Sequence, residues 1–169
     1  MSEAALKDAL AALGIGWSIL EHEAVYTVEE SLAIHDALPG AHTKNLFLKD
    51  SGGQFWLVTV EHSRRVDLKA LAGVIGAKKL SFGKAEDMER LVGVTPGSVT
   101  PLAALNDSGG AVRLVLDTEL ASADAVHVHP LRNTATIGLS GPDLVRALAA
   151  WGHDPLIAAI PERAPVDPA

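Results

Sequence analysis

Two stretches in which apolar and polar residues alternate, 43–49 and 54–60, predict a pair of β-strands, because successive side chains of a strand point to opposite faces. The segment between them, Asp50-Ser51-Gly52-Gly53, ends in two glycines that readily adopt the positive φ of a tight turn. These residues therefore predict a β-hairpin. Similar patterns predict further strands at 17–21, 78–82, 112–117, 125–129 and 134–139.

Apolar residues with helical spacing are interspersed with these strands. Leu6, Leu10 and Leu13 form one stripe of a predicted helix, and the capping residues Thr27 and Asp67 predict the starts of two others. The predicted helices cover 2–13, 27–38, 67–74, 85–92 and 142–151. Because helices and strands alternate without a regular βαβ repeat, the pattern favours one compact α+β domain over 1–169, with a curved mixed or antiparallel sheet flanked by helices.

Glycine and proline mark two segments that are neither long helices nor central strands. Residues 93–101 hold two glycines and two prolines, a density that predicts a shaped loop. Residues 154–169 are rich in proline and are expected to form an extended strap or a frayed tail.

The composition is that of a globular protein. The 169 residues are 48% hydrophobic and 21% charged, and no apolar run reaches the roughly 20 residues of a membrane span. The first ten residues lack the basic start and apolar stretch of a signal peptide, so the cytoplasm is the expected compartment. The absence of cysteine excludes disulfides, thiolate nucleophiles and thiolate metal sites.

Charge is distributed unevenly along the chain. The formal net charge is −7, which by itself disfavours nucleic-acid binding. Between residues 64 and 84, however, six basic side chains stand against the single acid Asp67. This basic segment is compatible with docking of one defined piece of RNA, although charge alone favours the solvated face of short helices. Its basic residues are Arg64, Arg65, Lys69, Lys78, Lys79 and Lys84.

Two features could bind an anion or a reacting ester. The period of two places Lys44 on the same strand face as Leu46 and Leu48, where its ammonium could bind a phosphate or an oxyanion. The loop from Gly97 to Pro101 could direct backbone amides at a ligand. The alternatives are a lysine that only protects a strand end and a loop that only turns the chain.

Histidine and serine patterns narrow the chemistry. His127 and His129 share one strand face, as in a two-histidine metal site, but no third ligand and no H-E-x-x-H motif accompany them. We therefore disfavour a zinc hydrolase, and His129 could be a pocket wall or a general base. No G-x-S-x-G motif is present, so an ester hydrolase of this sequence would use water as its nucleophile.

Four segments, taken together and in this order, resemble the YbaK/prolyl-tRNA editing-domain family over residues 17–152. They are 21–30 (EHEAVYTVEE), 42–48 (HTKNLFL), 97–101 (GSVTP) and 129–136 (HPLRNTAT). The resemblance implies a single editing domain with a curved mixed sheet, which acts in trans on mischarged tRNA(Pro) and needs neither a metal nor another cofactor.

The resemblance also assigns roles to individual residues. Lys44 matches the lysine needed for activity, which is thought to hold the terminal adenosine or its phosphate, and Gly97 and Pro101 match a loop that orients the ester. Asn45 and His129 match pocket positions of the alanine-specific branch, and Thr136 lies in a run that favours the same branch. The implied nucleophile is water, assisted by the ribose hydroxyl of the substrate.

The implied substrate is alanine esterified to tRNA(Pro). The alternatives are a Cys-tRNA(Pro) deacylase of the same fold and a non-catalytic tRNA-binding or regulatory module. The expected partner is the acceptor end of tRNA(Pro), with transient contact to prolyl-tRNA synthetase also considered; neither DNA nor a membrane is expected. The residues expected to contact tRNA are Arg64, Arg65, Lys78, Lys79 and Lys84.

Overall fold

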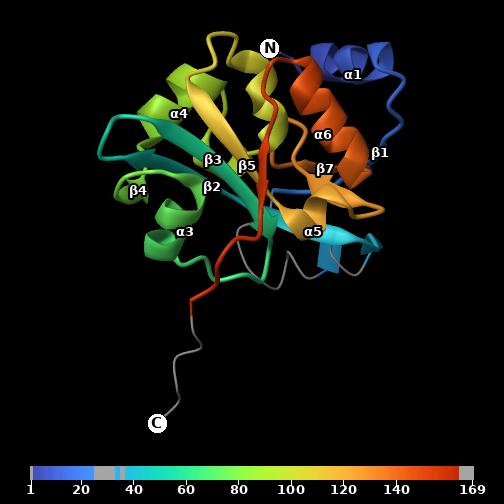
Figure 1. The fold of residues 1–169 in the computed structure, drawn as a ribbon. Coiled ribbons are helices and arrows are strands. Elements are labelled where there is room, and N and C mark those ends of the chain that lie inside the picture. Colours follow the sequence, from blue (N-terminus) through green and yellow to red (C-terminus); the bar gives the residue numbers. More distant parts are fainter. Residues whose placement is uncertain (1, 25–32, 35–36, 164–169) are drawn as a thin grey trace.

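The computed structural model describes residues 2–24, 33–34 and 37–163. Their strands form a mixed sheet in the order β1-β7-β6-β2-β3-β5-β8, with β4 paired to β2 (Figure 1). This confirms the predicted α+β class. The strands are β1 (Ser18–Glu21), β2 (Ala41–Asp50), β3 (Phe55–Glu61), β4 (Leu80–Phe82), β5 (Val112–Asp117), β6 (Val126–Val128), β7 (Ala135–Leu139) and β8 (Leu156–Ala158).

Strand directions explain why the sheet is mixed. The β2–β3 hairpin, β2–β4, β6–β7 and β1–β7 pair in antiparallel fashion. The pairs β2–β6, β3–β5 and β5–β8 are parallel. At the predicted hairpin turn, the carboxylate of Asp50 accepts hydrogen bonds from the backbone amides of Gly52 (2.9 Å) and Gln54 (3.0 Å), which fixes the turn.

Helices cover both faces of the sheet (Figure 1). On one face, α3 packs Leu71 and Ile75 against the apolar residues Leu48 and Val58 of β2 and β3. On the other face, α1, α4, α6 and η2 enclose a second apolar core. The helices are α1 (Glu3–Ala12), α3 (Leu68–Ile75), α4 (Ala85–Val92), α5 (Thr118–Ala121) and α6 (Gly141–Ala150), with short 3₁₀ helices η1 (Pro96–Ser98) and η2 (Pro101–Asn106).

Local capping signals explain the helix ends. Asp67 accepts a hydrogen bond from the amide of Ala70 at 3.0 Å, as the sequence predicts, and Gly76 and Gly93 end α3 and α4 in the left-handed region. The capping box predicted at Thr27 lies outside the described residues. None of the described helices is long and apolar enough to cross a membrane.

Two proline-rich segments are more ordered than the sequence predicts. In the loop 93–101, residues 96–98 form a 3₁₀ turn that begins at a proline, whose fixed φ suits a first helical position. Part of the expected tail is a strand: Leu156–Ala158 pairs with β5 in parallel. These three residues are therefore extended and not frayed, because a neighbouring strand supplies their backbone hydrogen bonds.

Candidate active site

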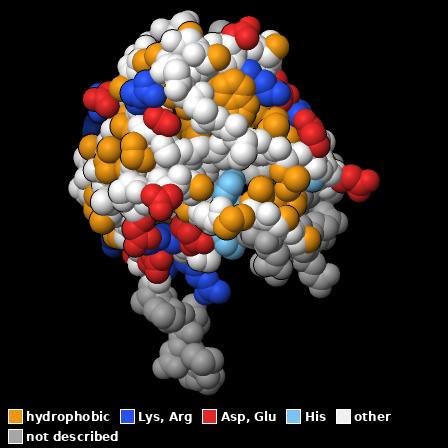
Figure 2. Space-filling model, turned by 90° about the vertical axis from the view of Figure 1, so that its right-hand side faces the viewer, with side chains coloured by type: hydrophobic (Ala, Val, Ile, Leu, Met, Phe, Trp, Pro, Cys, Tyr) orange, Lys and Arg blue, Asp and Glu red, His pale blue; other side chains and the backbone are white. Residues whose placement is uncertain are grey.

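A small cavity lies where β2 and β6 separate. The two strands pair only at Ala41–His42 with Val126–His127, although β2 continues to Asp50. The cavity has a volume of about 150 Å³, and histidine side chains reach the surface beside hydrophobic ones in Figure 2. It is lined by His22, Ile34, His42, Thr43, Gly97, His127, Val128, His129, Asn133 and Thr136.

Two stacked imidazoles line one side of the cavity. The rings of His42 and His127 lie 4.6 Å apart between centroids, at an interplanar angle of 21°. Each Nε2 donates to a backbone carbonyl of the turn before β2, that of Leu38 for His42 (2.7 Å) and that of Pro39 for His127 (3.0 Å). Both rings are buried, so this wall of the cavity is fixed by the backbone.

Another wall joins β1 to β7. The Nε2 atom of His22, just after β1, lies 2.9 Å from the hydroxyl of Thr136 on β7. The Nδ1 atom of the same ring lies 2.8 Å from the carbonyl oxygen of Glu23. The antiparallel register of β1 and β7, which pairs Leu20 with Thr136, brings these residues together from distant parts of the sequence.

His129 lies just beyond the end of β6, and its Nδ1 is 3.3 Å from the carbonyl oxygen of Ala135. Burial is the main cause that lowers the pKa of His129 below its ordinary value. The imidazole is therefore neutral at neutral pH. A neutral ring with Nδ1 donating to a carbonyl keeps Nε2 as a hydrogen-bond acceptor.

The Gly97–Pro101 loop closes the cavity on the side of η1. Gly97 lines the cavity, and a Cβ atom there would lie 3.2 Å from Nδ2 of Asn133, so a side chain at this position would press on its neighbour. Pro101 is buried at the start of η2 and is not among the residues that line the cavity. Pro101 therefore belongs to the backbone that follows the loop and not to the cavity wall.

Asn45 holds this loop against β2. Its side-chain nitrogen donates to the carbonyl of Val99 at 3.1 Å, and its side-chain oxygen accepts from the hydroxyl of Thr59. Asn45 is not among the cavity-lining residues. The structure thus places His129, Thr136 and Gly97 around one cavity, with Asn45 behind the loop.

Lys44 lines a different hollow, on the side of β2 covered by α3. This hollow has a volume of about 320 Å³ and also contains the cations Arg65 and Arg163 beside Leu46 and Phe82. Burial is the main cause that lowers the pKa of Lys44, and Arg163 and Arg65 lower it further against the opposing effect of Glu61. Three cations on one hollow suit a phosphate more than a neutral ligand.

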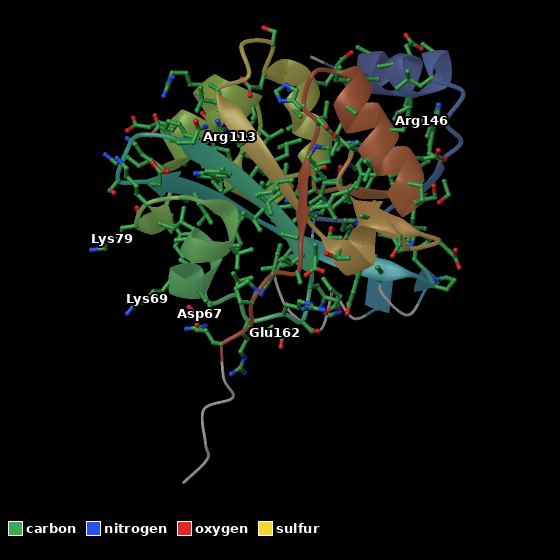
Figure 3. All side chains as sticks on the ribbon, viewed as in Figure 1. Asp67, Lys69, Lys79, Arg113, Arg146 and Glu162 are labelled. Atoms are coloured by element: carbon green, nitrogen blue, oxygen red, sulfur yellow. The ribbon has the colours of Figure 1, made fainter. Side chains whose placement is uncertain are left out.

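The basic segment separates into paired and exposed cations. Arg64 contacts three carboxylates, those of Glu119 (2.8 Å), Glu162 (3.5 Å) and the buried Asp117 (3.7 Å). The other basic residues of the segment are exposed, and Figure 3 shows Lys69 and Lys79 pointing away from the sheet on the α3 side. The exposed members are Arg65, Lys69, Lys78, Lys79 and Lys84.

Sequence reasoning did not assign His22, His42 or Asn133 to the site. All three lie within segments that carry the family resemblance, which is the signal that could have identified them. Among the residues that the structure describes, no group of three or more histidine or acidic side chains is placed to hold a metal ion.

Comparisons with known proteins agree with this geometry. The sequence profile of the family described as aminoacyl-tRNA editing domain matches residues 22–147. A Bos taurus protein named prolyl-tRNA synthetase associated domain-containing protein 1 is 42% identical over 159 residues, covering 91% of this chain and 92% of the relative. The prolyl-tRNA editing protein ProX of Acetoanaerobium sticklandii is 38% identical over 142 residues, covering 83% of this chain and 87% of the relative.

A solved structure described as a candidate trans-editing enzyme for prolyl tRNA synthetase has the same fold. Its TM-score is 0.72 at 23% identity, and the match covers 96% of this chain and 99% of that one. The resemblance of the four sequence segments to the prolyl-tRNA editing family is thus confirmed. The chain belongs to the aminoacyl-tRNA editing domain family and is an aminoacyl-tRNA hydrolase.

Proposed function

We propose that this chain acts in trans and hydrolyses the ester that joins alanine to tRNA(Pro). The observation that supports this substrate most directly is the small cavity of about 150 Å³ beside the Gly97 loop. A cavity of this size suits a methyl side chain and its ester. The name of the ProX relative, a prolyl-tRNA editing protein, supports the choice of tRNA.

A small cavity can select the amino acid of the substrate by its size. A synthetase that accepts proline rejects smaller amino acids poorly, because each missing methylene is worth only about 1–3 kcal/mol. A second site that admits alanine and excludes the proline ring corrects these errors. The stacked His42–His127 pair is suited to this exclusion, since both rings are held by backbone carbonyls.

In the proposed reaction, a water oxygen attacks the ester carbonyl carbon while the Gly97 loop orients the ester. The bond between this carbon and the ribose oxygen then breaks, and the ribose oxygen takes up a proton. The products are alanine and free tRNA. The neighbouring ribose hydroxyl assists the water, because positioning and preorganised dipoles can supply most of the acceleration.

The tRNA is held outside the cavity. Lys44, Arg65 and Arg163 surround a hollow suited to a phosphate near the 3′ end, and the exposed Lys78, Lys79 and Lys84 are suited to the acceptor stem. The charge of Arg64 is already neutralised by three carboxylates, so we assign it a structural role. We expect the reaction to take place in the cytoplasm. We also expect transient contact between this protein and prolyl-tRNA synthetase.

The test is the release of labelled alanine, cysteine and proline from tRNA(Pro) at catalytic enzyme concentration, with and without a chelator. We expect chelator-insensitive release of alanine alone. Release of cysteine would assign the chain to the alternative substrate, and no release at all would favour a binding module.

A substitution of Lys44 extends this test. Lys44→Ala should abolish turnover, whereas Lys49→Ala, on the same strand with its ammonium 5.2 Å from the Phe55 ring, should not. Equal turnover by the two variants would contradict the role of Lys44.

A further inference from the structure

The loop between β6 and β7, residues 129–134, carries the cavity residues His129 and Asn133. Its backbone is strained: Leu131 has a φ of 70°, and no other non-glycine residue has a positive φ in the part of the chain that the structure describes. The Cβ atom of a side chain disfavours this left-handed conformation. Such a conformation persists only where its surroundings hold it, so the loop needs contacts that fix its shape.

Arg132, the next residue, supplies these contacts. Its guanidinium binds Glu3 of α1 through Nε (2.7 Å) and Nη2 (3.1 Å). It binds Glu21 of β1 through Nη1 and Nη2, both at 2.7 Å, and Nη1 also donates to the hydroxyl of Thr134 at 2.8 Å. These five hydrogen bonds use all five N–H donors of the side chain. We call Arg132, Glu3 and Glu21 the arginine clamp.

The charges of the arginine clamp stabilise one another. The hydrogen bond from Arg132 is the largest cause that lowers the pKa of Glu3 and of Glu21 below the ordinary value of a glutamate. Both carboxylates therefore stay ionised at neutral pH, and pairing with two carboxylates fixes the plane of the guanidinium as well as its position. Since every donor of Arg132 is occupied, this arginine has none to offer a tRNA phosphate.

Two contacts connect the loop to the walls of the cavity. The backbone amide of His22 donates to the carbonyl of Thr134 at 3.0 Å, and His22 lines the cavity. Asn133 follows Arg132 directly and lies against Gly97, where a Cβ atom would be 3.2 Å from Nδ2 of Asn133. A shift of Arg132 therefore moves groups on two walls of the cavity.

Building on the proposed deacylase activity, we infer that Arg132 is a positioning residue: it clamps the loop 129–134 to α1 and β1, so that His129 and Asn133 keep their places in the cavity. Glu3 and Glu21 precede residue 22, where the match to the family profile begins. The arginine clamp thus makes a segment outside the matched region a working part of the site.

The test begins with Arg132→Met, which keeps an unbranched side chain and removes every donor. We expect kcat for deacylation of alanyl-tRNA(Pro) to fall roughly 10-fold, because the groups around the ester are displaced, and KM for the tRNA to stay within about 2-fold. Arg132→Lys, which keeps the charge but loses the planar fork, should recover part of the lost kcat. An unchanged kcat in Arg132→Met would overturn the inference, and so would a raised KM with unchanged kcat.

Arg146→Met is the matched control. Arg146 on α6 (Figure 3) forms an ion pair with Asp143 at 3.1 Å and donates to the carbonyl of Leu13 at 2.7 Å, and it is not among the described residues that line the cavity. This variant should lower the temperature of thermal unfolding and leave kcat unchanged. A loss of kcat equal to that of Arg132→Met would show that lost stability is the cause, and would overturn the positioning role.

A measurement independent of turnover separates the arginine clamp from the proposed function. In the wild type, the nitrogen NMR shifts of the His129 ring should report a proton on Nδ1, which lies 3.3 Å from the Ala135 carbonyl oxygen. In Arg132→Met we expect these shifts to move toward the average of the two neutral tautomers, because the ring loses its fixed orientation. Unchanged shifts would overturn the inference, whereas failure of the wild type to release alanine would overturn the proposed function alone.

A second variant keeps the test decisive if Arg132→Met does not fold. The Glu21 side chain is 66% exposed, so Glu21→Gln leaves the core intact and removes one charge of the arginine clamp. We expect it to change kcat and the His129 shifts in the same direction as Arg132→Met, by a smaller amount. A wild-type kcat together with wild-type shifts in Glu21→Gln would refute the role of the clamp.

Discussion

Asn45 is hydrogen-bonded to Val99: the side-chain amide on β2 donates to the loop carbonyl at 3.1 Å. The other end of the same amide accepts from Thr59 on β3. Because both ends are occupied by protein partners, Asn45 positions the loop that carries Gly97. The resemblance to the editing family, in contrast, implies a pocket position for Asn45.

Replacing Asn45 by alanine should therefore reduce activity through the loop. We expect Asn45→Ala to lower kcat by about 10-fold or more and the free energy of unfolding by about 1–3 kcal/mol, since the hydroxyl of Thr59 loses its partner. Deacylation kinetics and urea denaturation measure the two effects. The matched control is Asn106→Ala, which breaks a bond of 2.9 Å to the Val92 carbonyl and should affect stability alone. A normal kcat for Asn45→Ala would contradict the positioning role.

The space at Gly97 gives a second prediction. In Gly97→Ala the new methyl would lie 3.2 Å from Nδ2 of Asn133, tighter than ordinary packing, so the Asn133 side chain or the loop must move by a few tenths of an ångström. We expect this displacement at the cavity to lower kcat about 10-fold. Removing the obstacle in the double variant Gly97→Ala/Asn133→Ala should restore part of the activity. Gly109→Ala, where nothing lies within 4 Å of the new methyl, should behave as wild type. If the double variant is no better than the single one, steric contact with Asn133 is not the cause.

Neighbouring arginines should have opposite effects. Arg64→Ala leaves the buried carboxylate of Asp117 without its nearest cation, so we expect a loss of about 1–3 kcal/mol in the free energy of unfolding with little change in KM for tRNA. Arg65→Ala should leave stability nearly unchanged, raise KM and reduce the salt dependence of KM by about one unit of slope. Denaturation curves and kinetics over a salt series distinguish the two, and the reverse pattern would refute our division of the basic segment.

The lowered pKa of His129 predicts how stability depends on pH. In the unfolded chain this histidine titrates near pH 6.5, whereas burial lowers its pKa in the folded chain. As the pH falls below 6.5, the unfolded chain therefore binds a proton at this residue before the folded chain does. The free energy of unfolding should be constant above about pH 7 and should fall as the pH drops through 6.5. His42, whose pKa is also lowered mainly by burial, contributes in the same direction.

Denaturation at pH 7.5 and 5.5 measures this difference. His129→Gln should shrink it, and the remainder should come from residues such as His42. An unchanged difference in the variant would show that His129 does not supply the dependence.

Much of the fold could be predicted because its signals are local. The Asp50 turn, the Asp67 cap and the helix end at Gly93 are all determined within a few residues, and each was found at its predicted place. Strand β8 was missed because two of its three residues are exposed and its pairing with β5 depends on a distant part of the chain.

The site was less predictable for a related reason. The period of two correctly placed Lys44 with Leu46, but a strand pattern does not tell which cavity its face adjoins, and Lys44 lines the hollow with Arg163 instead of the cavity with His129. The contact between His22 and Thr136 depends on the register of β1 and β7, which residues 114 positions apart do not reveal in sequence.

The short pairing of β2 with β6 limits how this enzyme can change its substrate. The width of the opening between these strands is set largely by the main chain, since β2 and β6 are joined by the pairing of Ala41–His42 with Val126–His127 and by the hydrogen bond from the Thr43 hydroxyl to the His127 carbonyl. Trimming a lining side chain other than those of the stacked His42–His127 pair would therefore leave this width unchanged. Acceptance of a bulkier amino acid should therefore require replacement of His42 or His127, or an insertion, a deletion or a bulge beside them, so engineering or natural divergence toward larger residues should show first at this pair and in the lengths of these strands.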